Sequence, residues 1–302
     1  MLTYHMGWEG PGAGPDACGK RIRPMLVLLT VAAAGGNWKN ALPAASAIEL
    51  IHNFSLIHDD IEDNSELRRG RLTIWKKWGI AQATNAGDAL FALAHLEMLR
   101  LSEILPAATV IQALQSLDQT CLHLTQGQYL DLSFEKRLDL TENDYYQMVE
   151  GKTSAVLAAC TEIGAIIASV PADTRQSYQR FGKFLGLAFQ AQDDLLGIWG
   201  NAVLTGKSSD SDLVTGKKTL PVLYGINSGG AFYDRWIQGP ISPQEAPAIA
   251  DLLTADGAQE STRNQVDRLT KQAIQALESA HPQGEAGTAL IELAYQLLQR
   301  KS

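Results

Sequence analysis

The spacing of apolar residues constrains this chain most, because it follows the helical period over most of the 302 residues. Convincing alternation of apolar and polar residues, the mark of a strand, is absent. Alanine is frequent within the helical segments, which favours helix formation and close helix packing. The expected helices are residues 23–34, 41–63, 88–105, 111–132, 141–168, 172–199, 220–227, 243–255, 260–280 and 285–301. The sequence therefore predicts an all-α fold.

No repeat, low-complexity tract or long linker divides the chain, so we expect one domain over residues 1–302. Residues 1–18 are rich in glycine and proline and are expected to form a loop. The apolar stretch Met25–Gly36 is too short to span a bilayer, which argues against stable membrane insertion. The cysteines at 18, 121 and 160 are widely spaced, which favours buried thiols in a reducing, cytoplasmic location.

The formal net charge of −8 disfavours a nucleic-acid partner or an anionic membrane surface. An anionic ligand would therefore need a local basic patch or a metal ion. Residues suited to each occur together after an apolar segment, where a run of carboxylates that could bind a metal ion is followed at once by arginines. The carboxylates are Asp59, Asp60, Glu62 and Asp63, and the arginines are Arg68, Arg69 and Arg71.

On a helix, Asp59 and Asp63 lie about 40° apart around the axis and one turn apart along it. A second pair, Asp193 and Asp194, ends another apolar segment, "FLGLAFQAQDDLLGIWG". A single acidic run is as often a solvated helix face. Two such pairs favour Mg²⁺, which binds through one or two carboxylates, several waters and substrate phosphates. The nearby lysines and arginines then indicate a polyphosphate substrate.

Six segments in order resemble the motifs of the trans-isoprenyl diphosphate synthases, the polyprenyl synthetase family. They are "GKRIRP", "IELIHNFSLIHDDIED", "LRRGR", "GKTSAVLAA", "AFQAQDDLLG" and "TGKSSDSDLVTGKKTLP". The resemblance implies a helical bundle around a deep central cavity, and usually a homodimer. Family members normally begin with another helix or two before the first motif, so we expect this chain to be truncated or to begin late.

The resemblance also implies a metal centre. Asp59 and Asp63 would hold two Mg²⁺ ions and Asp193 a third across the cavity, with Asp60 and Asp194 in support. Mn²⁺ is the expected substitute. The matching residues for isopentenyl diphosphate are Lys20, Arg23, His52 and Arg69; for the allylic diphosphate, Arg68, Lys152, Lys207 and Lys217; and near the developing carbocation, Thr153 and Gln190.

The implied chemistry is the head-to-tail condensation of isopentenyl diphosphate with an allylic diphosphate. Metal ions, lysines and arginines stabilise the departing diphosphate. The double bond of isopentenyl diphosphate attacks the allylic cation, and the departing pyrophosphate takes the proton. A cavity lined by apolar side chains excludes water from the cation and holds the growing chain.

Product length depends on what closes that cavity. Phe54 precedes Asp59 by about 7.5 Å along the helix axis, and Ser55 beside it is small. The resemblance implies that a bulky residue at the Phe54 position forms the floor. Ordinary core packing of Phe54, or a floor formed by Phe91, is the alternative. We expect farnesyl diphosphate as the product, with geranylgeranyl diphosphate next.

The chain departs from the family pattern at two positions. Gly197 stands where many members have a third aspartate, and Asp210 replaces a frequent glycine. Because Asp193 remains, we expect activity to survive and Gly197→Asp to change turnover little.

Three other functions compete with this one. A terpene cyclase pairs its aspartate-rich motif with an Asn/Ser/Glu motif, and "NDYYQMVEG" fits that motif poorly. A di-iron bundle needs two Glu-x-x-His motifs, and the second candidate, "ESAH", runs into Pro282. A regulatory subunit of a prenyl synthase tends to lose the aspartates that this chain keeps.

Overall fold

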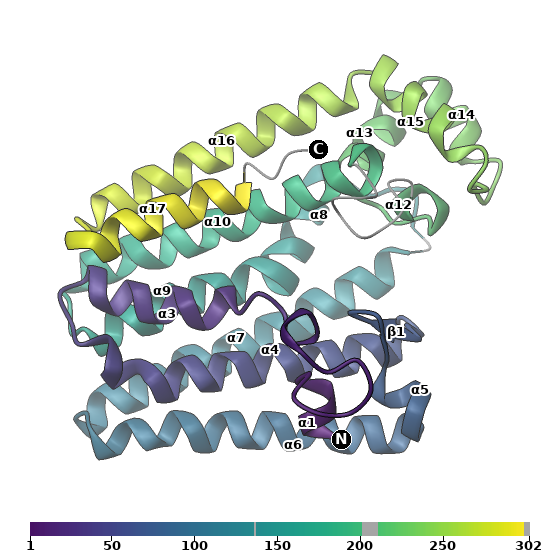
Figure 1. Ribbon diagram of the computed structural model, residues 1–302. Helices are drawn as coiled ribbons and strands as arrows, with labels where there is room; N and C mark the ends of the chain where they lie inside the picture. The colour runs from purple at the N-terminus through teal and green to yellow at the C-terminus, as the bar shows by residue number, and fades with distance from the viewer. Residues whose placement is uncertain (136, 201–210, 299–302) are drawn as a thin grey trace. The chain divides into compact units, whose positions relative to one another are not determined.

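The computed structural model describes residues 1–135, 137–200 and 211–298. It confirms the all-α class, since one short hairpin is the only sheet in these ranges (Figure 1). The chain forms two compact units, and the expectation of a single domain stays a prediction. The first unit is Met1–Cys121, Ala159–Tyr178 and Ala280–Leu290, and the second is Leu122–Ala158, Gln179–Ser279 and Ile291–Ser302.

The first unit carries the N-terminal half of the chain. The loop expected over residues 1–18 contains two one-turn helices, and the hairpin was not expected at all. The elements are α1 (Leu2–His5), α2 (Pro15–Cys18), α3 (Ile22–Ala33), the 3-10 turn η1 (Trp38–Ala41), α4 (Leu42–Glu62), β1 (Leu67–Arg68), β2 (Arg71–Leu72), α5 (Ile74–Trp78), α6 (Ile80–Leu99), the 3-10 turn η2 (Arg100–Glu103) and the start of α7 (Ala107–Phe134).

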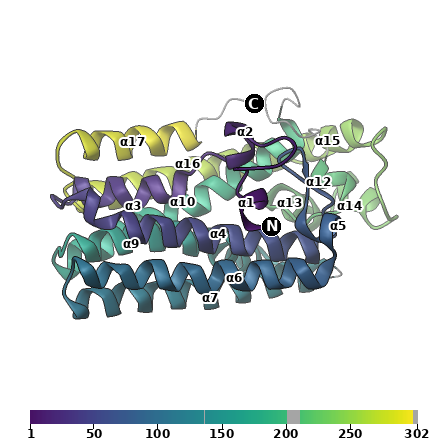
Figure 2. The same ribbon diagram turned by 60° about the horizontal axis from the view of Figure 1, so that its bottom comes forward.

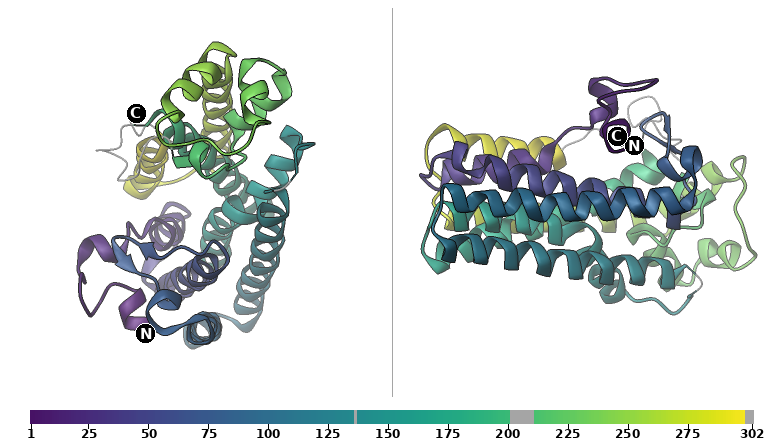
Figure 3. Two further views of the ribbon diagram at one scale, coloured as in Figure 1. Left: turned by 90° about the vertical axis from the view of Figure 1, so that its right-hand side faces the viewer. Right: turned by 90° about the horizontal axis from the view of Figure 1, so that it is seen from below.

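Helices α4 and α6 pack side by side in this unit (Figure 2). Their shared core includes Ile57 from α4 and Leu90 from α6, both almost fully buried. Helix α6 begins at Ile80 rather than at Asp88, and its His95 contacts Asp118 of α7 across 2.6 Å. Figure 3 shows α6 and α7 running alongside each other. This packing fixes the end of α4, where the first acidic pair lies.

The second unit carries the other acidic pair. Its elements are the end of α7, α8 (Glu142–Val149), the π-helical turn η3 (Glu150–Ser154), the start of α9 (Ala155–Ile167), most of α10 (Ala172–Trp199), α12 (Ser211–Val214), α13 (Leu220–Ser228), α14 (Ala231–Trp236), α15 (Ala246–Ala255), α16 (Ala258–Ser279) and the end of α17 (Gly284–Leu298). The short helices α5, α12 and α14 were not predicted.

The helix predicted over residues 141–168 is helical without a break from Glu142 to Ile167, and a π turn that was not predicted lies between α8 and α9. Thr141 and Asp144 form a capping box that starts α8. At the π turn the chain lies against α7 so closely that a Cβ on Gly127 would be 2.2 Å from the backbone nitrogen of Lys152. This glycine contact lets the turn sit directly on α7.

Two further expectations concern the whole chain. All three cysteines are free thiols; Cys121 and Cys160 are buried, but Cys18 is only half-buried. Among the described residues, no helix has both the length and the apolar character needed to cross a membrane.

Candidate active site

The C-terminal end of α4 carries the first acidic pair. Asp59 is half-buried and Asp63, the C-cap, is exposed, and the N–H of Asp63 donates to the Asp59 carbonyl across 2.8 Å. The helix dipole places partial negative charge at this end, so carboxylates there are unfavourable unless a cation is near. The site therefore favours a bound cation.

Asp60, between them, is buried and already paired. The guanidinium of Arg68 donates to its Oδ1 from Nε at 2.8 Å and from a terminal nitrogen at 2.7 Å. Burial raises the pKa of the Asp60 carboxyl, although the bond to Arg68 opposes that shift. Asp60 thus ties α4 to the hairpin that carries the arginines.

The hairpin places Arg69 at a two-residue turn. Arg69 and Gly70 have φ of 52° and 72°, the left-handed values that a type I′ turn requires. The Arg69 guanidinium donates to the Ala17 carbonyl across 3.0 Å. A Cβ on Gly19 would lie 2.6 Å from that guanidinium, so only glycine leaves room for it. The hairpin therefore brings Arg69 against the "GKR" loop, where Lys20 is exposed.

Arg23 and His52 complete this basic centre, since a terminal nitrogen of Arg23 lies 3.2 Å from His52 Nε2. Burial, reinforced by Arg23 and Arg69, lowers the pKa of His52 well below its ordinary value. His52 is therefore a neutral imidazole among guanidinium groups. Such a set has donors in excess of acceptors and suits a diphosphate.

Two residues of this region were given no individual role in the sequence analysis. Arg71 donates to the carbonyls of Glu9 and Pro11 at 2.8 and 3.0 Å, and its guanidinium lies 4.0 Å over the Tyr4 ring. It fastens the N-terminal segment to β2. His5, in that segment, has its pKa lowered to about 3 by burial and by the nearby arginines at 68 and 69. The position of Arg71 in "LRRGR" was visible, but its partners were not.

Asp194, in the second unit, is buried among hydrogen-bond donors. Its carboxylate accepts from the Tyr145 hydroxyl at 2.6 Å, the Leu220 N–H at 2.9 Å and the Gln190 side chain at 2.9 Å. Burial raises the pKa of Asp194 to about 6, against the pull of Lys217 and these donors. Asp194 therefore anchors α10 to α8 and α13, and the half-buried Asp193 beside it is the more accessible carboxylate.

The π turn delivers Thr153 to the same network. The Thr153 hydroxyl donates to Gln190 Oε1 across 2.9 Å, and Gln190 in turn donates to Asp194. The structure thus brings together both residues assigned to the carbocation. π-helical turns inside α-helices are frequent at functional sites.

The predicted lysines of this unit lie among carboxylates. Lys152 is paired with Asp131 of α7, a partner that the sequence analysis missed. Loss of hydration alone would lower the pKa of Lys217, but Asp194 and the carboxylates at 212, 131 and 193 raise it. Lys217 therefore keeps its charge. Lys207 and Asp210 lie outside the described residues.

In each unit taken by itself, the carboxylates are oxygen donors in a partly open position, which fits Mg²⁺. Asp59 and Asp63 would hold ions in the first unit and Asp193 in the second, with Asp60 and Asp194 in support through the contacts described above. Within the described ranges, no three His, Cys, Asp or Glu side chains gather to hold a metal by themselves. Such a site suits Mg²⁺, which draws its remaining oxygens from water and substrate phosphates.

The two candidates for the cavity floor touch each other. The rings of Phe54 and Phe91 are 5.3 Å apart at their centroids, in an edge-to-face arrangement. Phe54 also packs against the core shared by α4 and α6. Ser55, on the neighbouring face, donates its hydroxyl to the His52 carbonyl across 2.9 Å. The aromatic pair therefore acts as one unit in any account of product length.

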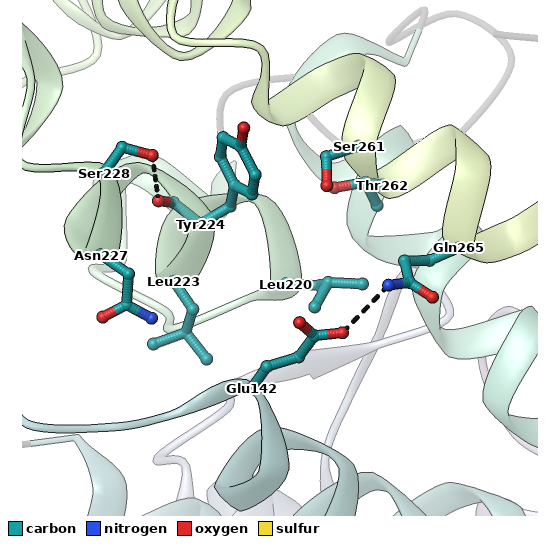
Figure 4. A pocket seen from close by; sticks show the side chains of 9 residues that line it. All are labelled: Glu142, Leu220, Leu223, Tyr224, Asn227, Ser228, Ser261, Thr262 and Gln265. Atoms are coloured by element: carbon teal, nitrogen blue, oxygen red, sulfur yellow. Dashed lines mark hydrogen bonds between the residues drawn. The ribbon is translucent and has the colours of Figure 1, made fainter.

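A separate pocket of about 280 Å³ opens in the second unit (Figure 4). Its walls come from α8, α13 and α16, and Glu142 accepts a hydrogen bond from Gln265 across 3.1 Å within it. None of the residues predicted for the site lines it. The lining residues are Glu142, Leu220, Leu223, Tyr224, Asn227, Ser228, Ser261, Thr262 and Gln265.

Comparison with known proteins decides the family. Residues 15–242 match the polyprenyl synthetase family model. The chain belongs to the polyprenyl synthetase family. It is 37% identical over 312 residues to a (2E,6E)-farnesyl diphosphate synthase of Mycobacterium tuberculosis, covering 100% of this chain and 86% of the other.

Other polyprenyl synthetases agree. A geranylgeranyl diphosphate synthase of Methanosarcina mazei is 36% identical over 286 residues, covering 95% of this chain and 87% of its own. The crystal structure of a polyprenyl synthetase from Streptomyces coelicolor superposes with a TM-score of 0.89 at 36% identity, covering 98% of this chain and 90% of the other. The chain is thus an enzyme of the prenyltransferase class with the isoprenoid synthase fold.

Proposed function

We propose that this polyprenyl synthetase condenses isopentenyl diphosphate with an allylic diphosphate, in a Mg²⁺-dependent reaction that gives a short-chain all-trans product. The basic centre of the first unit carries the proposal. There Arg23 lies 3.2 Å from a neutral His52, the charge of Arg69 acts on the same imidazole, and Lys20 is exposed in the neighbouring "GKR" loop. These cationic donors outnumber the carboxylate that acts on them, Glu49, which suits the diphosphate of the non-allylic substrate.

The allylic diphosphate is assigned to the lysines of the second unit and to Arg68. Lys152 and Lys217 are cations close to carboxylates, and the departing diphosphate would draw on both. Lys207 is assigned by resemblance alone. When bound at Asp59, Asp63 and Asp193, Mg²⁺ supplies Lewis-acid stabilisation of the leaving group.

The polar network beside the lysines has a different task. The hydroxyl oxygen of Thr153 and the side-chain oxygen Oε1 of Gln190 carry partial negative charge, which favours a developing carbocation. Asp194 holds Gln190 in place through the amide nitrogen. After the new carbon–carbon bond forms, a proton leaves the carbon next to the cationic centre of the isopentenyl unit, which gives the new double bond; the departing pyrophosphate takes it, since no side chain here is assigned as its base.

For product length, we propose farnesyl diphosphate first and geranylgeranyl diphosphate next. The relatives include enzymes of both names. The edge-to-face contact between Phe54 and Phe91 supports a short product, because two aromatic side chains leave less room than either alone.

One incubation series tests the function. The purified chain receives Mg²⁺, isopentenyl diphosphate and, in turn, dimethylallyl, geranyl or farnesyl diphosphate, and the products are read by mass. We expect elongation and pyrophosphate release that stop in excess chelator. A cyclic hydrocarbon formed without isopentenyl diphosphate would indicate a terpene cyclase. If the purified chain shows no turnover by itself but stimulates another prenyl synthase, it would be a regulatory subunit.

Substitution of the metal ligands sharpens this test. Asp59→Ala, Asp63→Ala and Asp193→Ala should each reduce turnover by orders of magnitude, because each removes a ligand where charge develops. The exposed Asp251→Ala on α15 is the matched control. Equal activity of all four variants would remove the metal assignment.

We also propose that the enzyme is a homodimer. Three leucines at intervals of three residues are exposed on α6: Leu93 at 41%, Leu96 at 60% and Leu99 at 46%. An apolar stripe of this kind suits the same face of a second copy. Light scattering of the wild type and of Leu96→Glu would test it, with a shift of the variant to monomer expected. A monomeric wild type would contradict it.

A further inference from the structure

The N-terminal segment, residues 1–18, is held against the hairpin by Arg71 of β2. The guanidinium donates to the backbone carbonyls of Tyr4, Glu9 and Pro11, the last two at 2.8 and 3.0 Å. It also lies 4.0 Å over the Tyr4 ring. Arg71 is buried, and a buried guanidinium is costly unless acceptors satisfy its donors. These three carbonyls therefore tie the course of the segment to β2.

Within the segment, Gly7 lies directly against Ala17 of α2. A Cβ on Gly7 would be 2.6 Å from the carbonyl carbon of Ala17 and 2.8 Å from its oxygen. Gly7 also has a φ of 76°, which glycine adopts at little cost. Its own carbonyl accepts from the Gly14 N–H across 3.1 Å, which closes the segment into a loop. The place of the Ala17 carbonyl therefore depends on how closely Gly7 approaches it.

The Ala17 carbonyl is an acceptor for Arg69 of the basic centre. A terminal nitrogen of the Arg69 guanidinium donates to it across 3.0 Å. A guanidinium carries five N–H donors in a fixed fork, so a bond at one nitrogen orients the group and leaves other donors for phosphate oxygens. Contacts thus run without a gap from Arg71 through the N-terminal segment to Arg69.

We infer that the N-terminal segment positions Arg69 for the diphosphate of isopentenyl diphosphate, and that Gly7 and Arg71 are the positioning residues that hold the segment in place. The inference rests on the proposed function. Residues 1–18 precede the first of the six family motifs, so the inference extends the site beyond the segments that carry the resemblance. Gly7 and Arg71 act through Ala17, and a shift of its carbonyl would turn the Arg69 fork away from the diphosphate.

Steady-state kinetics of Gly7→Ala provide the test, because the new methyl group must displace the Ala17 carbonyl. We expect the KM for isopentenyl diphosphate to rise by about tenfold, as for a lost hydrogen bond to a charged group. The KM for the allylic diphosphate should change less, since Arg68 keeps its bonds to Asp60.

Gly79→Ala is the matched control for backbone strain. Gly79 has a φ of 87°, and no described atom beyond its chain neighbours lies within 4 Å of a Cβ there. This variant should melt earlier than the wild type, as Gly7→Ala does, but keep the wild-type KM for isopentenyl diphosphate. A KM that rises equally in both variants would contradict the inference, because the effect would follow from lost stability.

Two further variants show whether the segment acts through Arg69. Gly7→Ala added to Arg69→Ala should raise the KM for isopentenyl diphosphate no further, since the group to be positioned is already absent. Arg71→Met keeps the alkyl stem on the Tyr4 ring and removes the three donors. It should give the same rise as Gly7→Ala, and it serves as the test if Gly7→Ala does not fold.

The outcomes separate the inference from the proposed function. A wild-type KM in folded Gly7→Ala and Arg71→Met, or a full further rise on top of Arg69→Ala, would overturn the inference and leave the proposed function standing. A wild type that neither binds isopentenyl diphosphate in calorimetry nor elongates an allylic diphosphate with it would overturn both.

Discussion

The Tyr145 hydroxyl donates a 2.6 Å hydrogen bond to the buried carboxylate of Asp194, 49 residues further along the chain. It is one of three donors that hold an acid whose pKa burial raises to about 6. Tyr145→Phe should therefore cost about 1–3 kcal/mol of unfolding free energy at pH 7. The loss should shrink near pH 5, where Asp194 is largely protonated in the folded state. Urea unfolding at both pH values measures it, and an equal loss at both would contradict this account.

Replacement of Arg68 and of Arg69, which lie at the turn of the hairpin, should have different effects on substrate binding and stability. Arg69→Ala removes a cation of the basic centre, so the KM for isopentenyl diphosphate should rise by about tenfold to a hundredfold. Arg68→Ala also leaves Asp60 buried without its partner, and we expect it to lose about 1.5–3 kcal/mol of stability. Sequence alone predicted an effect chiefly on the allylic substrate for Arg68. The structure predicts that both substrates suffer, because the hairpin loosens.

Steady-state kinetics with each substrate varied in turn distinguishes the two arginines. Arg100→Ala is the matched control, since that arginine is exposed and pairs with Glu97 on α6. A purely allylic effect of Arg68→Ala with unchanged stability would favour the simpler sequence-based assignment.

Stability should fall as the pH drops below 6.5, and His5 contributes to this. Its folded pKa is lowered to about 3 by burial and the nearby arginines, against an ordinary 6.5. The unfolded chain therefore takes up a proton that the folded chain does not, so stability is present above pH 6.5 and decreases below it. His52 acts in the same direction, and Asp194 opposes both. His5→Gln should make the fall less steep between pH 6.5 and 5.

A histidine of opposite sign serves as the control. Burial would lower the pKa of His95, but the Phe91 carbonyl and Asp118 raise it, so His95 adds stability that is lost as the pH rises. His95→Gln should therefore make the fall steeper. Urea midpoints over a pH series measure both, and parallel curves for all three proteins would contradict the linkage.

Product length should respond to the aromatic pair. Phe54→Ala should lengthen the product by at least one isoprene unit, and Phe91→Ala should act similarly because the rings are in contact. The double variant should give a longer product than either single variant. Product masses decide the question. An unchanged distribution in an active double variant would place the floor elsewhere.

Gly197→Asp should not be silent, contrary to the expectation from sequence. The new side chain would meet Asp212 at 2.0 Å and bring two carboxylates together. We expect lower turnover and a lower melting temperature, both partly restored by adding Asp212→Gly. Wild-type turnover in the single variant would show that α12 moves aside freely.

Regular helices were predictable where apolar periodicity is strong and long. The expected helix over residues 172–199 coincides with α10, and α4 differs from its prediction by one residue at each end. The hairpin escaped because strands of two residues are too short to show alternation. The residues proposed for the metal ions and diphosphates were named from their resemblance to the family motifs.

The supporting residues were not predictable in the same way. Tyr145, Asp131 and Arg71 act through partners distant in the chain, and one sequence carries no signal of such pairs. Asp212 was visible as an acid within "SSDSD", but only the packing of α12 on α10 reveals its place beside Gly197. The roles of these residues follow from their contacts in the folded chain more than from their residue types.

The π turn at Glu150–Ser154 makes the positions of nearby side chains sensitive to the deletion of a single residue. A π turn holds one residue more than an α-helical turn, so removing a single residue there would leave one uninterrupted helix. Every side chain on one flank would then rotate by about 100° relative to the other. Lys152 and Thr153 would leave their partners although no functional residue had been altered. The number of residues in this turn therefore determines the direction in which the Lys152 side chain points.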